Sequence, residues 1–406
     1  MSQKFLENGY EIVDFEGFAD IYVVNTCTVT NMSDKKSRQI IRRAKHNNPN
    51  AILVVVGCYA QVAKEKLEQI EEVDIVLGNN EKKNIVELVE NYNKPTVTDV
   101  MYQKEFVELG TTTYTEKTRA VIKVQDGCDR FCSYCIIPYA RGRVRSRKIE
   151  NVVEEVTKIA KEGIKEVVIT GIHIASYGKD FNNEITLIDL LEAINKIDGI
   201  ERIRLGSIEP TIITEEFLER LTKLEKICDH FHLSLQSGCD ETLKRMNRKY
   251  TTQEFEKIVN LLRKAYPEVA LTTDIIVGFP AETEEEFNKT YEFLSKIKFM
   301  KMHIFKYSQR NGTKAATMEE QIDGNVKEER SNKLIKLSDD NEKEFMKKYV
   351  GKQVDVLFEQ STEKYTEGHT KNYMLVKVPM NVELENTIKT VKITKLDNLI
   401  LDGEIK

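Results

Sequence analysis

Apolar runs alternate with amphipathic stretches along the first hundred residues. Runs such as DIYVVNTC (20–27) and AILVVVGC (51–58) are almost wholly apolar, and SDKKSRQIIRRAKHN (33–47) has helical periodicity with Ser33 as a candidate N-cap. Near-continuous apolar strands separated by helices are typical of a parallel sheet covered on both faces. We therefore predict a doubly wound parallel-sheet α/β domain over residues 1–104.

A second α/β series begins at Arg119. Six apolar segments alternate with helical patterns, namely AVIKVQDG, EVVITG, RIRLGS, HFHLSLQSG, ALTTDIIVGFP and KMHIFKYS. Six βα units indicate a (βα)6 partial barrel, which we place at 114–345. Residues 93–115 lose periodicity and read as a linker. The last 60 residues contain short segments rich in β-branched residues, in which apolar and polar positions alternate. This pattern predicts a small all-β barrel of five strands over 346–406.

Composition and charge narrow the class of protein. The 406 residues are 40% hydrophobic and 31% charged with a formal net charge of -5, as in soluble globular proteins, so a bulk polycation is excluded. No apolar run approaches the roughly 18 residues of a membrane span, and the N-terminus lacks the regions of a signal peptide. We expect a cytoplasmic protein without a membrane partner.

Seven cysteines, an odd number in a chain expected in a reducing compartment, argue against a disulfide framework. Cys27 and Cys58 each follow a predicted strand, so parallel pairing would bring both thiols to one sheet edge. They are either metal ligands or buried structural cysteines. Cys228 and Cys239 show no ligand spacing and are expected to pack in the core.

Cys128, Cys132 and Cys135 form a C-x3-C-x2-C loop directly after the first strand of the predicted barrel. Structural zinc sites use four ligands, and iron–sulfur clusters normally take four thiolates. Three thiolates on a [4Fe–4S] cluster leave one iron open, and S-adenosylmethionine (SAM) can fill that position and be cleaved to a 5′-deoxyadenosyl radical. The spacing, with Tyr134 before the last cysteine, resembles the radical SAM superfamily.

Other polar residues lie at the expected C-terminal tips of the barrel strands, the face that carries active sites in barrels. Candidates for binding SAM are Thr170, Gly171, Glu209, Gln236 and Asp274. For the carboxylates the alternative is an N-cap or a structural ion pair, and for Thr170 and Gly171 it is a plain turn. We expect most of the strand histidines, His173, His230, His232 and His303, to be satisfied core residues.

Arginines recur at every second position after the cysteine loop, at Arg141, Arg143, Arg145 and Arg147. In an extended segment this period projects them from one face, where guanidinium groups could bind phosphates. The alternative is a solvated loop. Residues 112–150 hold nine basic and four acidic residues in a net-acidic chain. We expect these arginines to contact a nucleic-acid backbone, and with the small β-barrel this favours RNA over a metabolite.

The whole chain resembles the methylthiotransferases, a radical SAM family. The resemblance rests on CDRFCSYCIIPYARGRVRSR, NTCTVTNMSDKKSRQ, VVGCYAQ, TGIHIASYG, HLSLQSGCDETLKRMNR and DIIVGFPAETEEEF. SYCIIPYARGRVRSR is most similar to the branch that acts on threonylcarbamoyladenosine of tRNA. The C-terminal segment resembles a TRAM domain, which implies tRNA binding.

The resemblance implies an enzyme that adds a methylthio group to C2 of threonylcarbamoyladenosine beside the anticodon. It implies a radical cluster on Cys128, Cys132 and Cys135, a second [4Fe–4S] cluster on Cys27 and Cys58, and SAM. As partners we expect the tRNA substrate and an electron donor, and for the protein itself a monomer. Alternatives are the same chemistry on isopentenyladenosine in tRNA or on a ribosomal protein, and a non-catalytic iron–sulfur protein that binds RNA.

The sequence departs from the family in its first domain. The family has three cysteines there, the first after an opening strand, whereas this chain has Cys27 and Cys58 and no such strand. A start about twenty residues late would explain both differences. If the chain is truly this short, the second cluster lacks a ligand, and methylthiolation is in doubt while SAM cleavage could survive.

Overall fold

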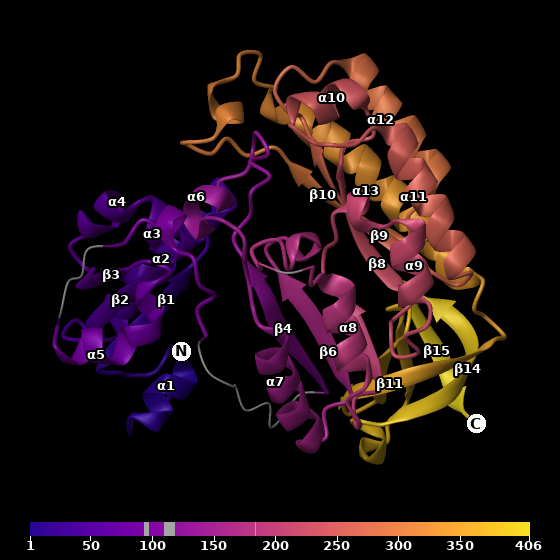
Figure 1. Cartoon of the computed structure of the whole chain (residues 1–406), viewed down its shortest axis with the longest axis horizontal. Coiled ribbons are helices and arrows are strands. Elements are labelled where there is room, and N and C mark those ends of the chain that lie inside the picture. Colours follow the sequence, from indigo (N-terminus) through magenta and orange to yellow (C-terminus); the bar gives the residue numbers. More distant parts are fainter. Residues whose placement is uncertain (93–96, 109–117, 183) are drawn as a thin grey trace. The chain divides into compact units, whose positions relative to one another are not determined.

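The computed structural model describes residues 1–92, 97–108, 118–182 and 184–406 (Figure 1). The chain divides into two compact units. Unit 1 comprises residues 1–113, 126–146 and 308–317, and unit 2 comprises 114–125, 147–307 and 318–406. The predicted linker at 93–115 lies partly outside the described residues, and its described part, 97–108, contains a short 3-10 helix at Val100–Tyr102. The predicted division into domains at 1–104, 114–345 and 346–406 stays a prediction.

Unit 1 is built on a parallel three-stranded sheet with the order β1-β2-β3. Its strands are β1 (Ile21–Thr26), β2 (Ile52–Gly57) and β3 (Ile75–Leu77). The helices are α1 (Ser2–Glu7), α2 (Asn31–Asn47), α3 (Cys58–Val62), α4 (Lys64–Glu68), α5 (Ile85–Glu90) and α6 (Ile137–Arg141), and a two-residue strand, β5, covers Arg145–Ser146. Helix α2 begins earlier than predicted, because the hydroxyl of Thr30, not of Ser33, caps it by accepting the Ser33 N–H at 3.1 Å.

Both faces of this sheet are buried, as the uninterrupted apolar strands predict. Leu53 and Val55 of β2 belong to one hydrophobic cluster, which also contains Ile41 of α2. Val54 and Val56 belong to a second cluster on the other face, packed with residues of α1 and α5. Successive side chains of a strand point to opposite faces of the sheet. Because helices cover both faces here, nearly every position of a central strand is buried and apolar.

Unit 2 contains the six predicted βα strands, all parallel to their neighbours. They are β4 (Arg119–Asp126, its last residue in unit 1), β6 (Glu166–Gly171), β7 (Arg202–Leu205), β8 (His230–Gln236), β9 (Ala270–Val277) and β10 (Lys301–Lys306). The strands pair as β4-β6-β7 and β8-β9-β10, and isolated bridges Ile203↔Ile227 and Ile208↔Leu233 connect β7 with the region of β8. The predicted partial barrel is confirmed.

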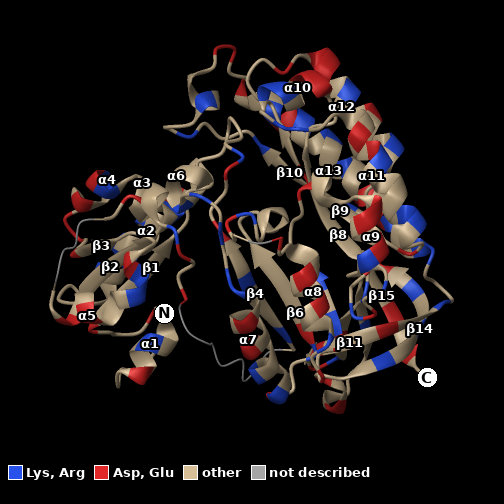
Figure 2. Cartoon of the chain, viewed as in Figure 1, with Lys and Arg blue, Asp and Glu red and all other residues tan. Residues whose placement is uncertain are grey.

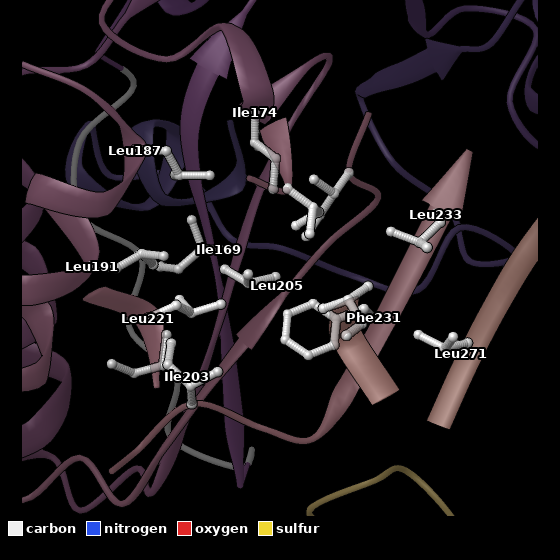
Figure 3. Packing of buried hydrophobic residues seen from close by; sticks show 14 of the residues in the cluster. Ile169, Ile174, Leu187, Leu191, Ile203, Leu205, Leu221, Phe231, Leu233 and Leu271 are labelled. Carbon is white, nitrogen blue, oxygen red and sulfur yellow. The ribbon is translucent and has the colours of Figure 1, made fainter. Parts of the chain in front are cut away.

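Helices cover the outer side of these strands (Figure 1). They are α7 (Ile149–Lys161), α8 (Leu187–Asn195), α9 (Glu215–Leu221), α10 (Asp240–Arg245), α11 (Thr252–Ala265), α12 (Glu284–Ile297) and α13 (Gly324–Lys347). The largest hydrophobic core lies between strands and helices. In Figure 3, Leu187 and Leu191 of α8 point toward Ile169 of β6, and Leu205 lies close to Phe231.

The C-terminal segment forms the predicted closed five-stranded barrel, in the order β11-β12-β13-β15-β14. Its strands are β11 (Gln353–Ser361), β12 (Tyr365–Thr370), β13 (Leu375–Pro379), β14 (Ile388–Asp397) and β15 (Ile400–Ile405). Alternate residues such as Val356, Phe358 and Val376 fill its interior. Closure removes the unpaired edges that an open sheet of this length would expose.

Charged residues lie on the outer helices, where both signs are interspersed on α11 and α12 (Figure 2). No helix among the described residues is long and apolar enough to cross a membrane.

Candidate active site

The three-cysteine loop leaves the end of β4 in a tight turn. The Cys128 amide donates to the carbonyl of Gly142 at 3.0 Å, and the Cys135 amide donates to the carbonyl of Cys132 at 2.9 Å. Gly127 has a φ of 72°, and a Cβ there would lie 1.8 Å from the carbonyl oxygen of Arg143. Only glycine permits this approach, which fixes the direction in which the loop departs.

The donor set of this loop suits an iron–sulfur cluster. All three cysteines are half-buried and none of them forms a disulfide, and the Arg130 amide donates to the sulfur of Cys128 at 3.4 Å. No group of three His, Cys, Asp or Glu in the described parts of the chain is arranged to hold a single metal ion. In a [4Fe–4S] cluster each of the three thiolates would bind a different iron. Burial raises the pKa of the Cys128 thiol, so iron would have to supply the charge that stabilises its thiolate.

Cys27 and Cys58 lie at one edge of the unit 1 sheet, as predicted. Thr26 and Gly57, which precede them, are register partners in β1 and β2. Cys27 is exposed and Cys58 is buried as the first residue of α3. The two positions thus combine one accessible and one protected thiol at adjacent strand ends.

Arg141 lies against this pair of cysteines. Its Nε donates to the sulfur of Cys58 at 3.1 Å, and its Nη1 lies 3.7 Å from the Asp126 carboxylate. Burial lowers the pKa of the Arg141 guanidinium, but the negative charges of Cys58, Asp126 and Cys27 outweigh it and raise that pKa overall. Arg141 is therefore a fixed cation beside the sulfur of Cys58.

The expectation that four arginines project from one face of an extended segment is wrong. Arg141 ends helix α6. Arg145 is buried, donates to the carbonyls of Arg141 and Arg143 and lies 3.5 Å from Asp126, and Arg147 is buried in an ion pair with Glu155. Only Arg143 is exposed, with its guanidinium 5.1 Å from the Phe131 ring centroid. Carboxylates outside the run, Asp126 and Glu155, pair with the arginines that turn inward, and the period of two does not reveal them.

One predicted SAM-binding residue, Glu209, lies in the loop that follows β7, and another, Gln236, is the last residue of β8. Glu209 is buried, and its Oε2 accepts from Nη2 of Arg248 at 2.6 Å, so the alternative of a structural ion pair is realised here. Gln236 ends β8 with a φ of 75°, next to a register irregularity between Leu233 and Gln236. A left-handed conformation is unusual for a residue other than glycine, and such strain is concentrated at functional positions.

The remaining residues predicted to bind SAM differ in whether they lie at the end of a strand. Asp274 lies in the middle of β9, not at its tip, 3.2 Å from Nε2 of His232 and in register with His303. Gly171 ends β6, and a Cβ there would lie 2.8 Å from the carbonyl oxygen of Gln125. Its bare backbone therefore permits close strand packing. Thr170 precedes it, half-buried, and Tyr134 is half-buried inside the cysteine loop.

Sequence reasoning missed Arg310, a buried residue that binds the region after Cys27. Its Nη1 donates to Asn31 Oδ1 at 2.7 Å, and its Nη2 donates to Thr28 Oγ1 at 2.5 Å and to Asp34 Oδ2 at 2.8 Å. Asn79 was also missed: its Nδ2 donates to the carbonyl of Ala140 at 2.7 Å and lies 4.0 Å from the sulfur of Cys58. Neither residue stands in a motif, so only tertiary structure reveals them.

The comparisons with known proteins agree with this arrangement. Residues 122–294 match the radical SAM superfamily, and residues 1–78 match a family described as uncharacterized protein family UPF0004. The threonylcarbamoyladenosine tRNA methylthiotransferase MtaB of Bacillus subtilis is 43% identical over 97% of this chain and 89% of its own length. The tRNA-2-methylthio-N(6)-dimethylallyladenosine synthase of Clostridium novyi is 35% identical over 98% of this chain and 90% of its own.

Solved structures agree on the fold. The radical SAM methyltransferase TsrM of Kitasatospora setae superposes with a TM-score of 0.56 at 16% identity, covering 78% of this chain and 68% of that one. Extensive similarity to methylthiotransferases, together with the three-cysteine loop at the end of β4, shows that the chain belongs to the radical SAM methylthiotransferase family.

Proposed function

We propose that this protein is a tRNA methylthiotransferase that converts N6-threonylcarbamoyladenosine beside the anticodon to its 2-methylthio derivative. The cysteine loop at the end of β4 carries this proposal, together with relatives whose names specify the same reaction. The dimethylallyladenosine enzymes are the competing assignment, since they match over nearly the whole chain at lower identity.

Cys128, Cys132 and Cys135 would hold a [4Fe–4S] cluster and leave its fourth iron open to the amino and carboxylate groups of SAM. When bound, such a cluster would supply the one-electron reduction of SAM, with an external reductant as electron source, for radical chemistry at C2. The loop supplies the amide that donates to the sulfur of Cys128. Tyr134 would pack beside the cluster.

The SAM molecule would be bound by groups at the carboxyl ends of the strands. Gln236 is held by its bulge in an orientation that a regular strand would not allow. Glu209, fixed by Arg248, would accept from hydroxyl or ammonium groups of SAM. Thr170, Gly171 and Asp274 complete the proposed set, with Asp274 deeper along its strand than the others.

Cys27 and Cys58 would hold the second cluster, which supplies or relays the sulfur, while a further SAM provides the methyl group. Arg141 would donate to the ligating sulfur of Cys58. A donor at that sulfur offsets the negative charge of a thiolate-bound cluster. Among the four arginines of the run, Arg143 keeps the exposure that contact with a tRNA phosphate requires.

The test is formation of 5′-deoxyadenosine by the reconstituted protein with SAM, reductant and tRNA that carries the modified adenosine. Alanine at Cys128, Cys132 or Cys135 should abolish it. Alanine at Cys228, a buried cysteine without ligand spacing, is the matched control and should preserve it. Undiminished formation in any variant of the cysteine loop would refute the cluster assignment.

A further inference from the structure

Unit 1 contains a cavity of about 690 Å3 bordered by neighbours of three of the predicted cluster cysteines. Thr28 follows Cys27, Tyr59 follows Cys58, and Ile136 follows Cys135, and all three line the cavity. A group bound here would contact residues adjacent in sequence to cysteines that, under the proposed function, hold the two clusters.

The lining is polar and carries an excess of positive charge. Of the fifteen lining residues only Val62, Ala63 and Ile136 are apolar. Four lining side chains are cationic, at Arg38, Lys64, Lys66 and Arg310, and two are acidic, at Asp34 and Glu65. Such a lining suits a hydrogen-bonding anion and would leave unpaired polar groups around a hydrocarbon.

Arg38 and Arg310 differ in how they are paired. Arg310 is buried, and Asp34 offsets its charge within a fixed set of hydrogen bonds. Arg38, on helix α2, donates from Nη1 to the hydroxyl of Tyr59 at 2.9 Å. No carboxylate within the described part of the chain forms an ion pair with Arg38. Arg38 is therefore a held guanidinium whose charge a ligand could neutralise, and its planar fork matches a carboxylate.

The covalent structure of adenine determines which part of the substrate lies near the reacting C2 and could enter this cavity. N1 of the ring lies between C2 and C6, and C6 carries N6. A base that presents C2 for reaction therefore holds its N6 substituent a few bonds away. The threonylcarbamoyl substituent provides one ureido group, a hydroxyl and a carboxylate, whereas dimethylallyl is a hydrocarbon.

We propose that this cavity binds the threonylcarbamoyl side chain and that Arg38 pairs with its carboxylate. The inference rests on the proposed function and deepens it by naming the residue that discriminates threonylcarbamoyladenosine from dimethylallyladenosine. Arg310 is the positioning residue that holds Thr28, Asn31 and Asp34 in the wall.

The test measures binding of anticodon stem-loop RNAs to the cluster-loaded protein with SAM. The RNAs carry unmodified adenosine, threonylcarbamoyladenosine, or its analogue with the carboxylate converted to a neutral methylamide. The unaltered protein should bind the acid about 10- to 100-fold more tightly than the other two, as a charge-assisted pair provides. Arg38→Met should remove that preference and leave binding of the unmodified RNA within twofold.

Arg42→Met is the matched control, since Arg42 is exposed one turn further along α2 and does not line the cavity. It should keep the full preference. Arg38→Lys, which retains the charge without the fork, should keep part of it. The comparison between the acid and the methylamide RNA uses only the unaltered protein. It therefore tests the inference even if a variant fails to fold.

Equal binding of acid and methylamide by the unaltered protein, or a full preference retained by Arg38→Met, would overturn the inference. Turnover of the threonylcarbamoyladenosine RNA, measured in parallel, separates the two claims. If turnover persists, the proposed function stands and only the role of Arg38 falls. If turnover is absent while dimethylallyladenosine RNA reacts, both fall together.

Discussion

At the residue scale, the arginines after the cysteine loop show how tertiary partners assign roles that spacing cannot. Arg141 and Arg143 are two residues apart, yet one lies against the sulfur of Cys58 and the other is exposed beside Phe131. The cysteine loop itself was predictable, because its ligands are local. The contact of Arg141 with Cys58 spans 83 residues and leaves no trace in the sequence pattern.

The contact between Arg141 and Cys58 predicts an electrostatic effect on the second cluster. In protein with Cys128, Cys132 and Cys135 replaced by alanine, Arg141→Met should lower the reduction potential of the remaining cluster. The shift should be roughly 60 mV, since a hydrogen bond of about 1.4 kcal/mol corresponds to 59 mV for one electron. A redox titration followed by electron paramagnetic resonance measures it.

Arg143→Met is the control for that titration and should leave the potential unchanged. An equal potential in the Arg141 variant and the parent would contradict the proposed role of Arg141. If the protein with Cys128, Cys132 and Cys135 replaced by alanine contained no iron and sulfide, the proposal of a second cluster would itself be wrong.

At the scale of elements, the strands were predictable and their special positions were not. Apolar runs located all six barrel strands and the unit 1 sheet because burial on both faces leaves a long, simple signal. Asp274 was expected at a strand tip but lies in the middle of β9. Helix α2 begins at Asn31, so its cap is Thr30. Ends of elements depend on a few hydrogen bonds, which hydrophobic periodicity does not encode.

Strand β8 contains a buried histidine that makes stability depend on pH. Burial, with smaller contributions from Arg204, His232 and His303, lowers the pKa of His230 to about 3. The unfolded chain takes up this proton near pH 6.5, so stability is full above that pH and falls as the pH drops toward 3. Between pH 7.5 and 5 the loss from His230 should be about 2 kcal/mol in the free energy of unfolding.

Urea unfolding at pH 7.5 and pH 5 checks this effect. His230→Gln keeps a side chain able to bond Thr272, the partner of the imidazole at 3.1 Å, and should reduce the pH dependence by that amount. An unchanged difference between the two pH values in this variant would show that His230 is not the group responsible.

At the scale of the whole molecule, composition and hydrophobic pattern predicted the fold class and the small C-terminal barrel. They did not predict the contacts that attach this barrel to the βα strands of unit 2. Glu166 of β6 is buried with Arg204 of β7, whose Nε donates to it at 2.7 Å, and Arg204 also donates to the carbonyl of Lys371 in the C-terminal segment. Burial opposes ionisation of Glu166, but Arg204 and its neighbours hold the pKa of that carboxyl below its usual value. The barrel is thus anchored within unit 2 by buried charges, a class of contact that hydrophobic patterning leaves out.

We propose that this chain methylthiolates threonylcarbamoyladenosine in tRNA. The most direct measurement is mass spectrometry of tRNA nucleosides from a host that lacks its own enzyme and expresses this chain. We predict 2-methylthio-threonylcarbamoyladenosine with the unaltered chain and none with Cys128→Ala. A methylthio group found only on dimethylallyladenosine, or on neither nucleoside while cluster-loaded protein is present, would contradict the account.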